Sequence, residues 1–302
     1  MLRSVERFLR LPGATTRHEL LATLGDRLWL LRRWMGARAA GRTSFDVGEF
    51  EKEELGVHEV DEHGLALRNE TFAGDRLGDA LVRFYERHAE LLPDGDEKSR
   101  VAGIARHLAT WNGPLDLDRI TAAYHPSTRF RDHRVFGTWA ARDVDEMLLH
   151  FRLQLELAPD FSARFDDVLA ADVHAMVARM TFFGTARDSG GSFENVLCVT
   201  FTFADDGRTN QSDVFEAEQV AEALARFDEL TGTSQEEASP FENALVRYAE
   251  LRARSGRIDG SDEGTAAFAN AVTRMENRYV RATAALDWKV LAELFALDLR
   301  FD

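Results

Sequence analysis

The sequence predicts an α+β fold in which helices come first and an antiparallel meander of strands follows. In the middle of the chain, segments with helical periodicity precede four strand-like runs. Turn-forming stretches such as RDSGGS and ADDGR separate these runs. Parts of the same pattern recur near both ends of the chain. The prediction is therefore one complete unit flanked by two partial units.

The complete unit is predicted at residues 97–230, between the turn-rich stretches PDGDEK and TGTSQEEASP. Its opening helices are expected at Glu97–Trp111 and Leu117–Tyr124, and its first strand at TRFRDHR. A longer helix, Val144–Leu155, follows because its apolar residues keep the spacing of one helix face. The four later strands are expected at Phe161–Ala170, Val173–Thr185, Phe193–Ala204 and Thr209–Phe215.

The two partial units are predicted to be complementary. Residues 1–92 carry only the later elements: strands at His18–Leu24, Arg27–Ala37, Phe45–Val60 and Leu65–Thr71, and a helix at Asp75–Leu91. Residues 241–302 carry only the opening helices and a first strand. We therefore expect the C-terminal helices, Phe268–Phe295, to cover the N-terminal strands, within the chain or across a homodimer.

Two gapless internal alignments support this division. GLALRNETFAGDRLGDALVRFYE, from Gly64, aligns with GRTNQSDVFEAEQVAEALARFDE, from Gly207, at one constant offset. DLDRITAAYHPSTRFRD, from Asp116, aligns with DWKVLAELFALDLRFD, from Asp287, at a second constant offset. An acid two places before the shared phenylalanine also recurs, as Glu70 and Asp213. The chain is expected to be a segment of a longer tandem array.

Composition excludes several classes of function. The formal charge is −15, from 37 basic and 52 acidic residues, which disfavours binding to nucleic acid. The single cysteine, Cys198, excludes an intrachain disulfide and indicates a reducing, cytoplasmic location. No run approaches the roughly 18 apolar residues of a membrane span.

The order of the middle unit resembles the nuclear transport factor 2-like superfamily, and within it the SnoaL-like branch. The residues that carry this resemblance are RFRDHRVFG, the hairpins, and the closing GRTNQSDVFEAEQVAEALARFDEL. Asp132-His133-Arg134 and Phe193-Glu194-Asn195 more specifically resemble tandem repeats appended to large actinobacterial regulators, including nucleotide-cyclase and transcription-regulator chains. The resemblance implies a cone, in which a strongly curved antiparallel sheet wraps helices around a pocket. Members include isomerases, cyclases, dehydratases and binding modules, so the fold leaves the function open.

Asp132 is the candidate catalytic residue. Strand alternation places it on the face of Phe130, so it lines the cone if Phe130 points inward. A carboxylate in an apolar pocket has a raised pKa and serves as a general acid or base. The structural alternative is that Asp132 caps the following turn or pairs with Arg134.

The other candidates for the pocket are His133, His150, Glu194, Asp213 and Met180. Alternation sends His133 to the face opposite Asp132, and His150 flanks the apolar stripe of its helix. Glu194 or Asp213 could supply a second polar group, although a structural role is the better explanation of the recurring acid. Met180 is interpreted as core or pocket wall. The histidines lack metal-ligand spacing, VHEVDEHG is interpreted as a polar hairpin turn, and no cofactor fingerprint is present, so neither metal nor cofactor is predicted.

Two functions follow. The preferred one is a non-catalytic module in a larger cytosolic regulatory protein, which binds a small apolar ligand or a neighbouring unit. The alternative is a cofactor-free SnoaL-like enzyme that performs proton transfer on an apolar substrate, with Asp132 as acid or base.

Overall fold

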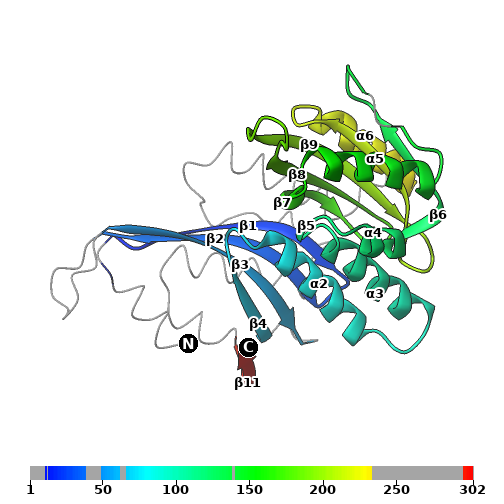
Figure 1. The fold of residues 1–302 in the computed structure, drawn as a ribbon. Helices are drawn as coiled ribbons and strands as arrows, with labels where there is room; N and C mark the ends of the chain where they lie inside the picture. Colours follow the sequence, from blue (N-terminus) through cyan, green and yellow to red (C-terminus); the bar gives the residue numbers. More distant parts are fainter. Residues whose placement is uncertain are drawn as a thin grey trace.

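The computed structural model describes residues 11, 13–38, 49–61, 66–137 and 140–232, together with the backbone of 295–301. In these residues, strands β1–β11 form two curved sheets, and helices α2–α6 pack with them (Figure 1). The middle sheet consists of β5–β10, and the N-terminal sheet consists of β1–β4 and β11. The predicted α+β class with a strongly curled, antiparallel-rich sheet is confirmed.

The middle unit follows the predicted order of elements. Its strand order is β5-β7-β8-β9-β10-β6, and β10 pairs with β6 in parallel while the other pairs are antiparallel. The elements are α3 (Asp96–Ala109), β5 (Gly113–Pro114), α4 (Leu117–Ala123), β6 (Tyr124–Asp132), α5 (Val144–Leu157), β7 (Ser162–Ala171), β8 (Ala175–Thr185), β9 (Ser192–Phe203), β10 (Thr209–Glu216) and α6 (Val220–Thr231).

Side-chain caps fix where two of these helices begin. The Asp116 carboxylate accepts hydrogen bonds from the backbone N–H groups of Asp118 and Arg119 at the start of α4. Asp143 accepts from the N–H of Glu146 at the start of α5. These bonds satisfy N–H groups that the first turn of a helix leaves without partners. The caps therefore set the positions from which α4 and α5 cross the sheet.

The N-terminal sheet repeats the later part of this arrangement. Its strand order is β1-β2-β3-β4-β11, and the first four strands are antiparallel neighbours. The elements are β1 (Thr15–Leu24), β2 (Leu28–Ala37), β3 (Phe50–Val60), β4 (Ala66–Ala73), α2 (Leu77–Leu91) and β11 (Phe295–Phe301). β11 pairs with β4 in parallel, as β6 pairs with β10. Residues 268–294, which carry most of the expected C-terminal helices, lie outside the described residues.

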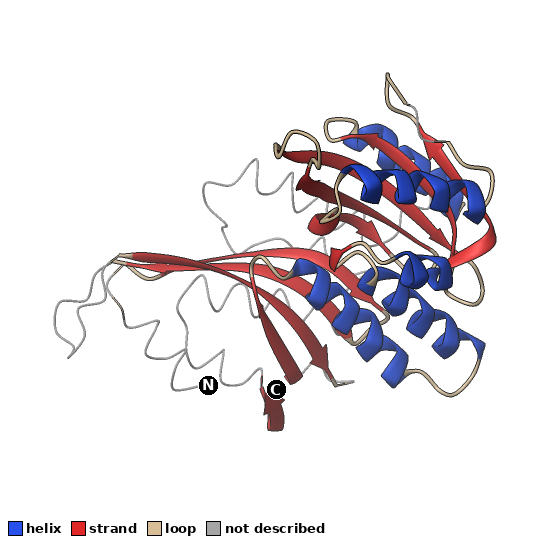
Figure 2. Ribbon diagram, in the orientation of Figure 1, coloured by secondary structure: helices blue, strands red, loops and turns tan. Residues whose placement is uncertain are grey.

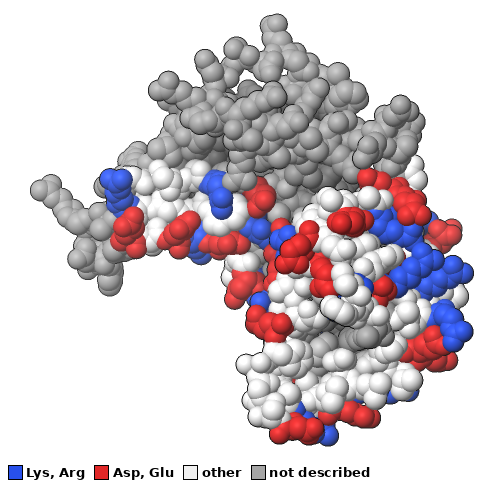
Figure 3. Space-filling model, turned by 90° about the horizontal axis from the view of Figure 1, so that it is seen from above, with Lys and Arg blue, Asp and Glu red and all other residues white. Residues whose placement is uncertain are grey.

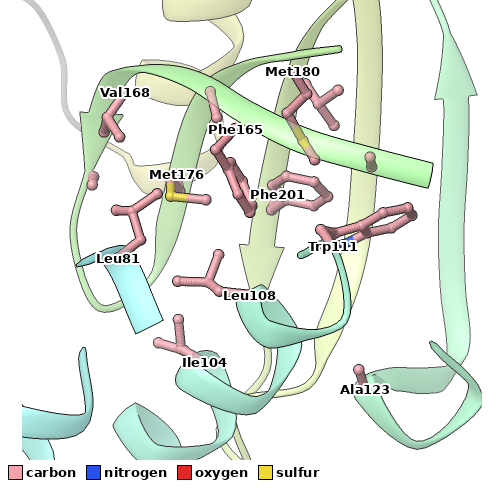
Figure 4. Close-up of a cluster of buried hydrophobic side chains, with 14 of the residues drawn as sticks. Leu81, Ile104, Leu108, Trp111, Ala123, Phe165, Val168, Met176, Met180 and Phe201 are labelled. Carbon is pink, nitrogen blue, oxygen red and sulfur yellow. The ribbon is translucent and has the colours of Figure 1, made fainter. Parts of the chain in front are cut away.

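Helix α2 joins the two sheets into one hydrophobic core. Leu81 of α2 packs in the same cluster as Ile104 of α3 and Phe165 of β7 (Figure 4). The Tyr85 hydroxyl of α2 also donates a hydrogen bond of 2.8 Å to the backbone oxygen of Asp172. Of the stretch PDGDEK, predicted as a linker, only residues 93–95 connect the packed helices α2 and α3, because residues 96–98 form the first turn of α3.

The repeated glycine has a steric role in its second copy. Gly207 lies in the turn between β9 and β10 and has a positive φ of 77°. A Cβ atom at this position would lie 2.0 Å from the backbone oxygen of Arg100 in α3. Gly103 of α3 faces the same turn, and its Cβ would lie 2.4 Å from the oxygen of Asp206. Backbone contact between α3 and this turn therefore requires glycine on both sides.

Closing helices cover one face of each sheet. α6 packs on Val177, Cys198 and Phe215 of the middle sheet through Ala223 and Phe227. α2 packs on the N-terminal sheet, where Leu30, Leu55 and Val57 share its core cluster. We call these the helix-covered faces, and the opposite faces the inner faces.

Charged side chains of both signs are spread over the surface of the described residues. Acidic and basic side chains lie next to one another over the face shown in Figure 3. The helices gather around the middle unit, whereas the far end of the β1–β2 ribbon extends away from them (Figure 2).

No helix in the described part of the chain is long and apolar enough to cross a membrane.

Candidate functional site

The inner face of the middle sheet encloses a cavity of about 310 Å³. Aromatic and aliphatic side chains from α5, β6, β8, β9 and β10 form most of its wall. The lining residues are Trp111, Tyr124, Phe130, Arg134, Phe136, Phe151, Gln154, Phe161, Phe182, Phe193, Asn195, Leu197, Val199, Phe201 and Val214. Concave, mostly apolar pockets with a few polar groups are the usual form of small-molecule sites.

His107 of α3 fixes the aromatic floor of the cavity. The Trp111 indole N–H donates to His107 Nε2 over 3.3 Å, and His107 Nδ1 lies 2.9 Å from Thr209 Oγ1. With Nε2 accepting, the proton is placed on Nδ1, so the neutral ring donates to Thr209. Complete burial lowers the pKa of His107 to about 3. His107 is therefore a neutral structural residue that holds Trp111 against Phe201.

The rim carries an ion pair between Asp132 and Arg134. Both guanidinium nitrogens Nε and Nη2 donate to the Asp132 carboxylate over 2.8 Å, and the backbone N–H of Arg134 donates over 3.1 Å. Asp132 is thereby turned into the loop after β6, and it is Arg134 that lines the cavity. The hydrogen bonds that Arg134 donates to Asp132 raise the pKa of Arg134. The geometry matches the pairing that the sequence left open as the structural alternative for Asp132.

The remaining polar lining groups are amides and a phenol. Gln154 comes from α5 and Asn195 from β9. The Tyr124 hydroxyl lies 3.5 Å from Ser212 Oγ, and burial raises the pKa of this phenol, so it stays neutral. Phe136 lines the opening, with 89% of its surface exposed. Among the described lining residues there is no carboxylate, histidine or lysine.

His133 and Asp213 meet on the helix-covered face, away from the cavity. His133 Nε2 lies 2.6 Å from Asp213 Oδ1, and its ring stacks on Phe215 at 4.5 Å. Asp213 is fully buried and also contacts Arg226 of α6 at 3.4 Å and Gln211 at 2.5 Å. This network ties β10 and the end of β6 to α6.

The other three candidates also lie away from the cavity wall. Glu194 is exposed and pairs with Arg164 at 3.4 Å. His150 is partly exposed on α5. Met180 is fully buried beside Phe201 in the core (Figure 4). None of the three is a cavity-lining residue.

Sequence reasoning missed Arg134, Gln154 and Trp111 as lining residues. Gln154 follows the buried Phe151 by three positions, so helical spacing was a usable signal. Arg134 lies two residues beyond Asp132, outside the strand, so alternation could not place it. Trp111 ends the predicted helix Glu97–Trp111 and follows the buried Ile104 and Leu108 at helical spacing, so the pattern indicated that it is buried but not that it lines a cavity.

The N-terminal sheet places His58 differently from its prediction as a turn residue. His58 is a buried residue of β3, and its ring stacks on Trp29 of β2 at 5.1 Å. The described residues contain no group of three or more His, Cys, Asp or Glu side chains that could hold a metal ion. His58 therefore belongs to the interior of the N-terminal sheet.

Comparisons with known proteins agree with this geometry in the middle unit. Residues 104–211 match the family model of the SnoaL-like domain. No curated protein matches the chain.

Several solved structures are similar to less than half of the chain. TsrD from Streptomyces laurentii is 23% identical, with a TM-score of 0.32, over 47% of this chain and 100% of its own. BvnE pinacolase from Penicillium brevicompactum is 14% identical, with a TM-score of 0.34, over 48% and 99%. An NTF2-like protein from Burkholderia thailandensis is 19% identical, with a TM-score of 0.32, over 44% and 98%.

The chemistry available in the cavity is that of recognition. Its aromatic wall favours an apolar or aromatic molecule. Arg134, Gln154 and Asn195 offer N–H donors to an oxygen acceptor on that molecule. Because Asp132 balances the charge of Arg134, a neutral acceptor such as a carbonyl suits the rim.

Proposed function

We propose that the middle unit is a non-catalytic binding module for a small apolar ligand, carried by a segment of a tandem array in a larger cytosolic regulatory protein. One observation carries this proposal: the described cavity-lining residues include no group that titrates near neutral pH. General acid–base catalysis requires such a group within hydrogen-bond reach of the substrate.

The contacts of Asp132 support binding over catalysis. Its carboxylate accepts three hydrogen bonds from Arg134, and 2% of its side chain is exposed. A general base with both oxygens engaged by a guanidinium is a weak proton acceptor, because protonation must break a charge-assisted bidentate pair. The alternative enzyme would need Asp132 to leave this pair.

The array part of the proposal is supported by the repeated sheet. β4 with α2 repeats β10 with α6 in order and in sequence. A chain built from such units presents several inner faces to ligands or to neighbouring units.

A fluorescence titration tests the binding proposal. Prodan, a naphthalene ketone, combines an aromatic body with a neutral carbonyl and shifts its emission to the blue in apolar surroundings. We expect saturable binding of prodan to the full chain. Leu197→Trp, which fills the cavity, should weaken binding by about tenfold or more, because overpacking removes the space for the ligand. Val196→Trp, at the 38% exposed neighbouring position, should leave the affinity unchanged.

The same probe tests the enzyme alternative. Prodan carries α-hydrogens next to its carbonyl, and a general base in the cavity would exchange them for deuterium in D₂O. We expect the full chain to exchange them no faster than the Leu197→Trp variant, as followed by NMR. Exchange that the wild-type chain accelerates and Asp132→Asn abolishes would establish the enzyme instead. Equal prodan affinity in Leu197→Trp and Val196→Trp would contradict the assigned cavity.

A further inference from the structure

The two parallel strand pairs share one register. In the middle sheet Tyr124 pairs with Thr209, Arg129 with Gln211, and Phe130 with Ser212. In the N-terminal sheet Phe295 pairs with Ala66, Arg300 with Arg68, and Phe301 with Asn69. Each residue of the second set aligns with its counterpart in the first set in the two internal alignments, without any adjustment of their offsets. Even the register shift after the first pair recurs. β11 therefore takes the place of β6.

The faces of the two sheets correspond as well. On β9, Leu197, Val199 and Phe201 line the cavity. The positions that pair with β4 as these pair with β10 are Glu54, Gly56 and His58 of β3. These residues lie on the face opposite α2, because α2 packs with Leu55 and Val57 instead. The inner face of the N-terminal sheet is thus the counterpart of the cavity wall.

This inner face is buried and polar. Trp29, His58 and Asn69 stand side by side across β2, β3 and β4, with exposed fractions of 1%, 6% and 5%. Trp29 Nε1 and Asn69 Oδ1 are buried without a hydrogen-bond partner among the described residues. Arg33 and Glu54 form an ion pair of 2.5 Å on the same face. Buried polar atoms without partners are costly, so this face suits a covering segment that supplies polar groups beside its apolar ones.

The segment that precedes β11 is the natural occupant. In the middle unit, α4 ends at Ala123 and β6 starts at the next residue, so α4 leads straight onto the inner face, where Ile120 is fully buried. At the same offset, residues 288–294 precede β11, Asp287 stands at the position of the helix cap Asp116, and Leu291 at the position of Ile120.

We propose that residues 287–294 dock as a helix on the inner face of the N-terminal sheet of the same chain, so that the two ends of the chain build a second, split SnoaL-like unit. The enclosed wall then carries His18, Arg33, Glu54 and His58, where the middle unit carries Phe165, Met180, Leu197 and Phe201. The inner face of the second unit is therefore polar, whereas the inner face of the middle unit is apolar.

Amide hydrogen exchange of the full chain tests this docking. Leu291→Asp should increase exchange in peptides from β2, β3 and β4 by at least about tenfold, because a charge at the buried contact undocks the segment. Two matched controls sharpen the result. Lys289→Asp, at the counterpart of exposed Asp118, should change nothing, and Ile120→Asp should raise exchange in the middle sheet. Unchanged exchange of β2–β4 in Leu291→Asp, or an equal effect of Lys289→Asp, would overturn the proposal.

A disulfide test identifies which chain supplies the segment. In a Cys198→Ala background, Arg68→Cys with Arg300→Cys places thiols on directly paired residues, within bridging distance of neighbouring strands. We expect a disulfide inside the monomer, at a yield independent of protein concentration. Arg68→Cys with Phe301→Cys, one residue out of register, should form much less. A covalent dimer, or a yield that rises with concentration, would show that a second copy is the occupant and would overturn docking within the chain.

Discussion

The two sheets of this chain share their strand order and register but differ on the face that each curls around. The middle sheet presents Phe165, Met180 and Phe201, whereas the N-terminal sheet presents His18, Arg33 and His58 at the corresponding positions. The helix-covered faces are alike, since both pack apolar residues against a closing helix. The comparison indicates that the helix-covered face specifies the fold, while the inner face is free to change its chemistry.

The recurring acid belongs to the part that the two regions share. Asp213 contacts Arg226 at 3.4 Å and Gln211 at 2.5 Å. Glu70 contacts Arg83 at 2.8 Å and Arg68 at 2.7 Å, and all three residues stand at the aligned positions of the first copy. The repeat therefore preserves a structural network that ties the closing helix to its sheet.

The largest difference between the two sheets is expected in how much stability each contributes at acidic pH. Burial, and then the charge of Arg33, lower the pKa values of His18 and His58 to about 3. Since these residues are near 6.5 in the unfolded chain, the unfolded state binds more protons between these values. Stability is then lost as pH falls from 6.5, by up to about 1.4 kcal/mol per pH unit for each histidine.

Replacing both histidines with the residues of the middle sheet, His18→Phe with His58→Phe, should remove the part of this dependence that His18 and His58 contribute. Buried His107, whose pKa is also lowered to about 3, keeps its own smaller share. Urea unfolding at pH 7 and pH 5 measures it, and His125→Phe, which alters a partly exposed histidine, is the control. A double variant that loses as much stability between pH 7 and pH 5 as the wild-type chain would contradict the assignment to His18 and His58.

The stability of the middle sheet should depend most on the aromatic side chains that line its cavity. Phe201 is 1% exposed and packs edge-on against His107 and near Trp111. Phe201→Ala should lower the free energy of unfolding by about 3–5 kcal/mol, because it leaves a cavity in a close-packed core. Val196→Ala on the same strand should cost less than about 0.5 kcal/mol. Urea unfolding gives both values, and comparable losses would mean that the wall is not part of the core.

The shared network should be weaker in the N-terminal sheet than in the middle sheet. Asp213→Asn should cost about 3 kcal/mol, because it leaves Arg226, whose side chain is 13% exposed, without its buried partner. Glu70→Gln should cost about 1–2 kcal/mol, because the Glu70 side chain is 12% exposed whereas that of Asp213 is fully buried. Each arginine keeps a second ion pair, Arg83 with Glu90 and Arg226 with Glu229. Chemical unfolding of both variants decides the order. A larger loss for Glu70→Gln would reverse the comparison.

The smallest expected effect concerns the helix caps. Asp116→Ala should lower the free energy of unfolding by about 1 kcal/mol, because two N–H groups of α4 lose their acceptor. If the split unit forms as proposed, Asp287→Ala should cost a similar amount. Thermal unfolding of the two variants measures this. A neutral Asp287→Ala would argue that residue 287 caps no helix.

Local pattern predicted the elements closely, and failed where side chains leave the regular backbone. The helix predicted at Val144–Leu155 is α5, Val144–Leu157, because its apolar stripe and the Asp143 cap are both local signals. The direction of Asp132 could not be predicted by alternation, since Arg134 folds back onto it from the loop. His58 was interpreted as a turn residue because the polar residues around it resemble a loop, whereas the pairing of β3 with β2 and β4 buries it.

The sequence alone determined the order of elements, their repeated copies and the SnoaL-like resemblance, because periodicity, turn residues and fixed offsets can all be read from the linear order of the residues. Only the tertiary structure decided that Arg134 lines the cavity, that His133 contacts Asp213, and that β11 joins β4 from a distant part of the chain. Those outcomes depend on which distant side chain completes a hydrogen bond or an ion pair, and that choice is made when the two sheets and their helices pack together.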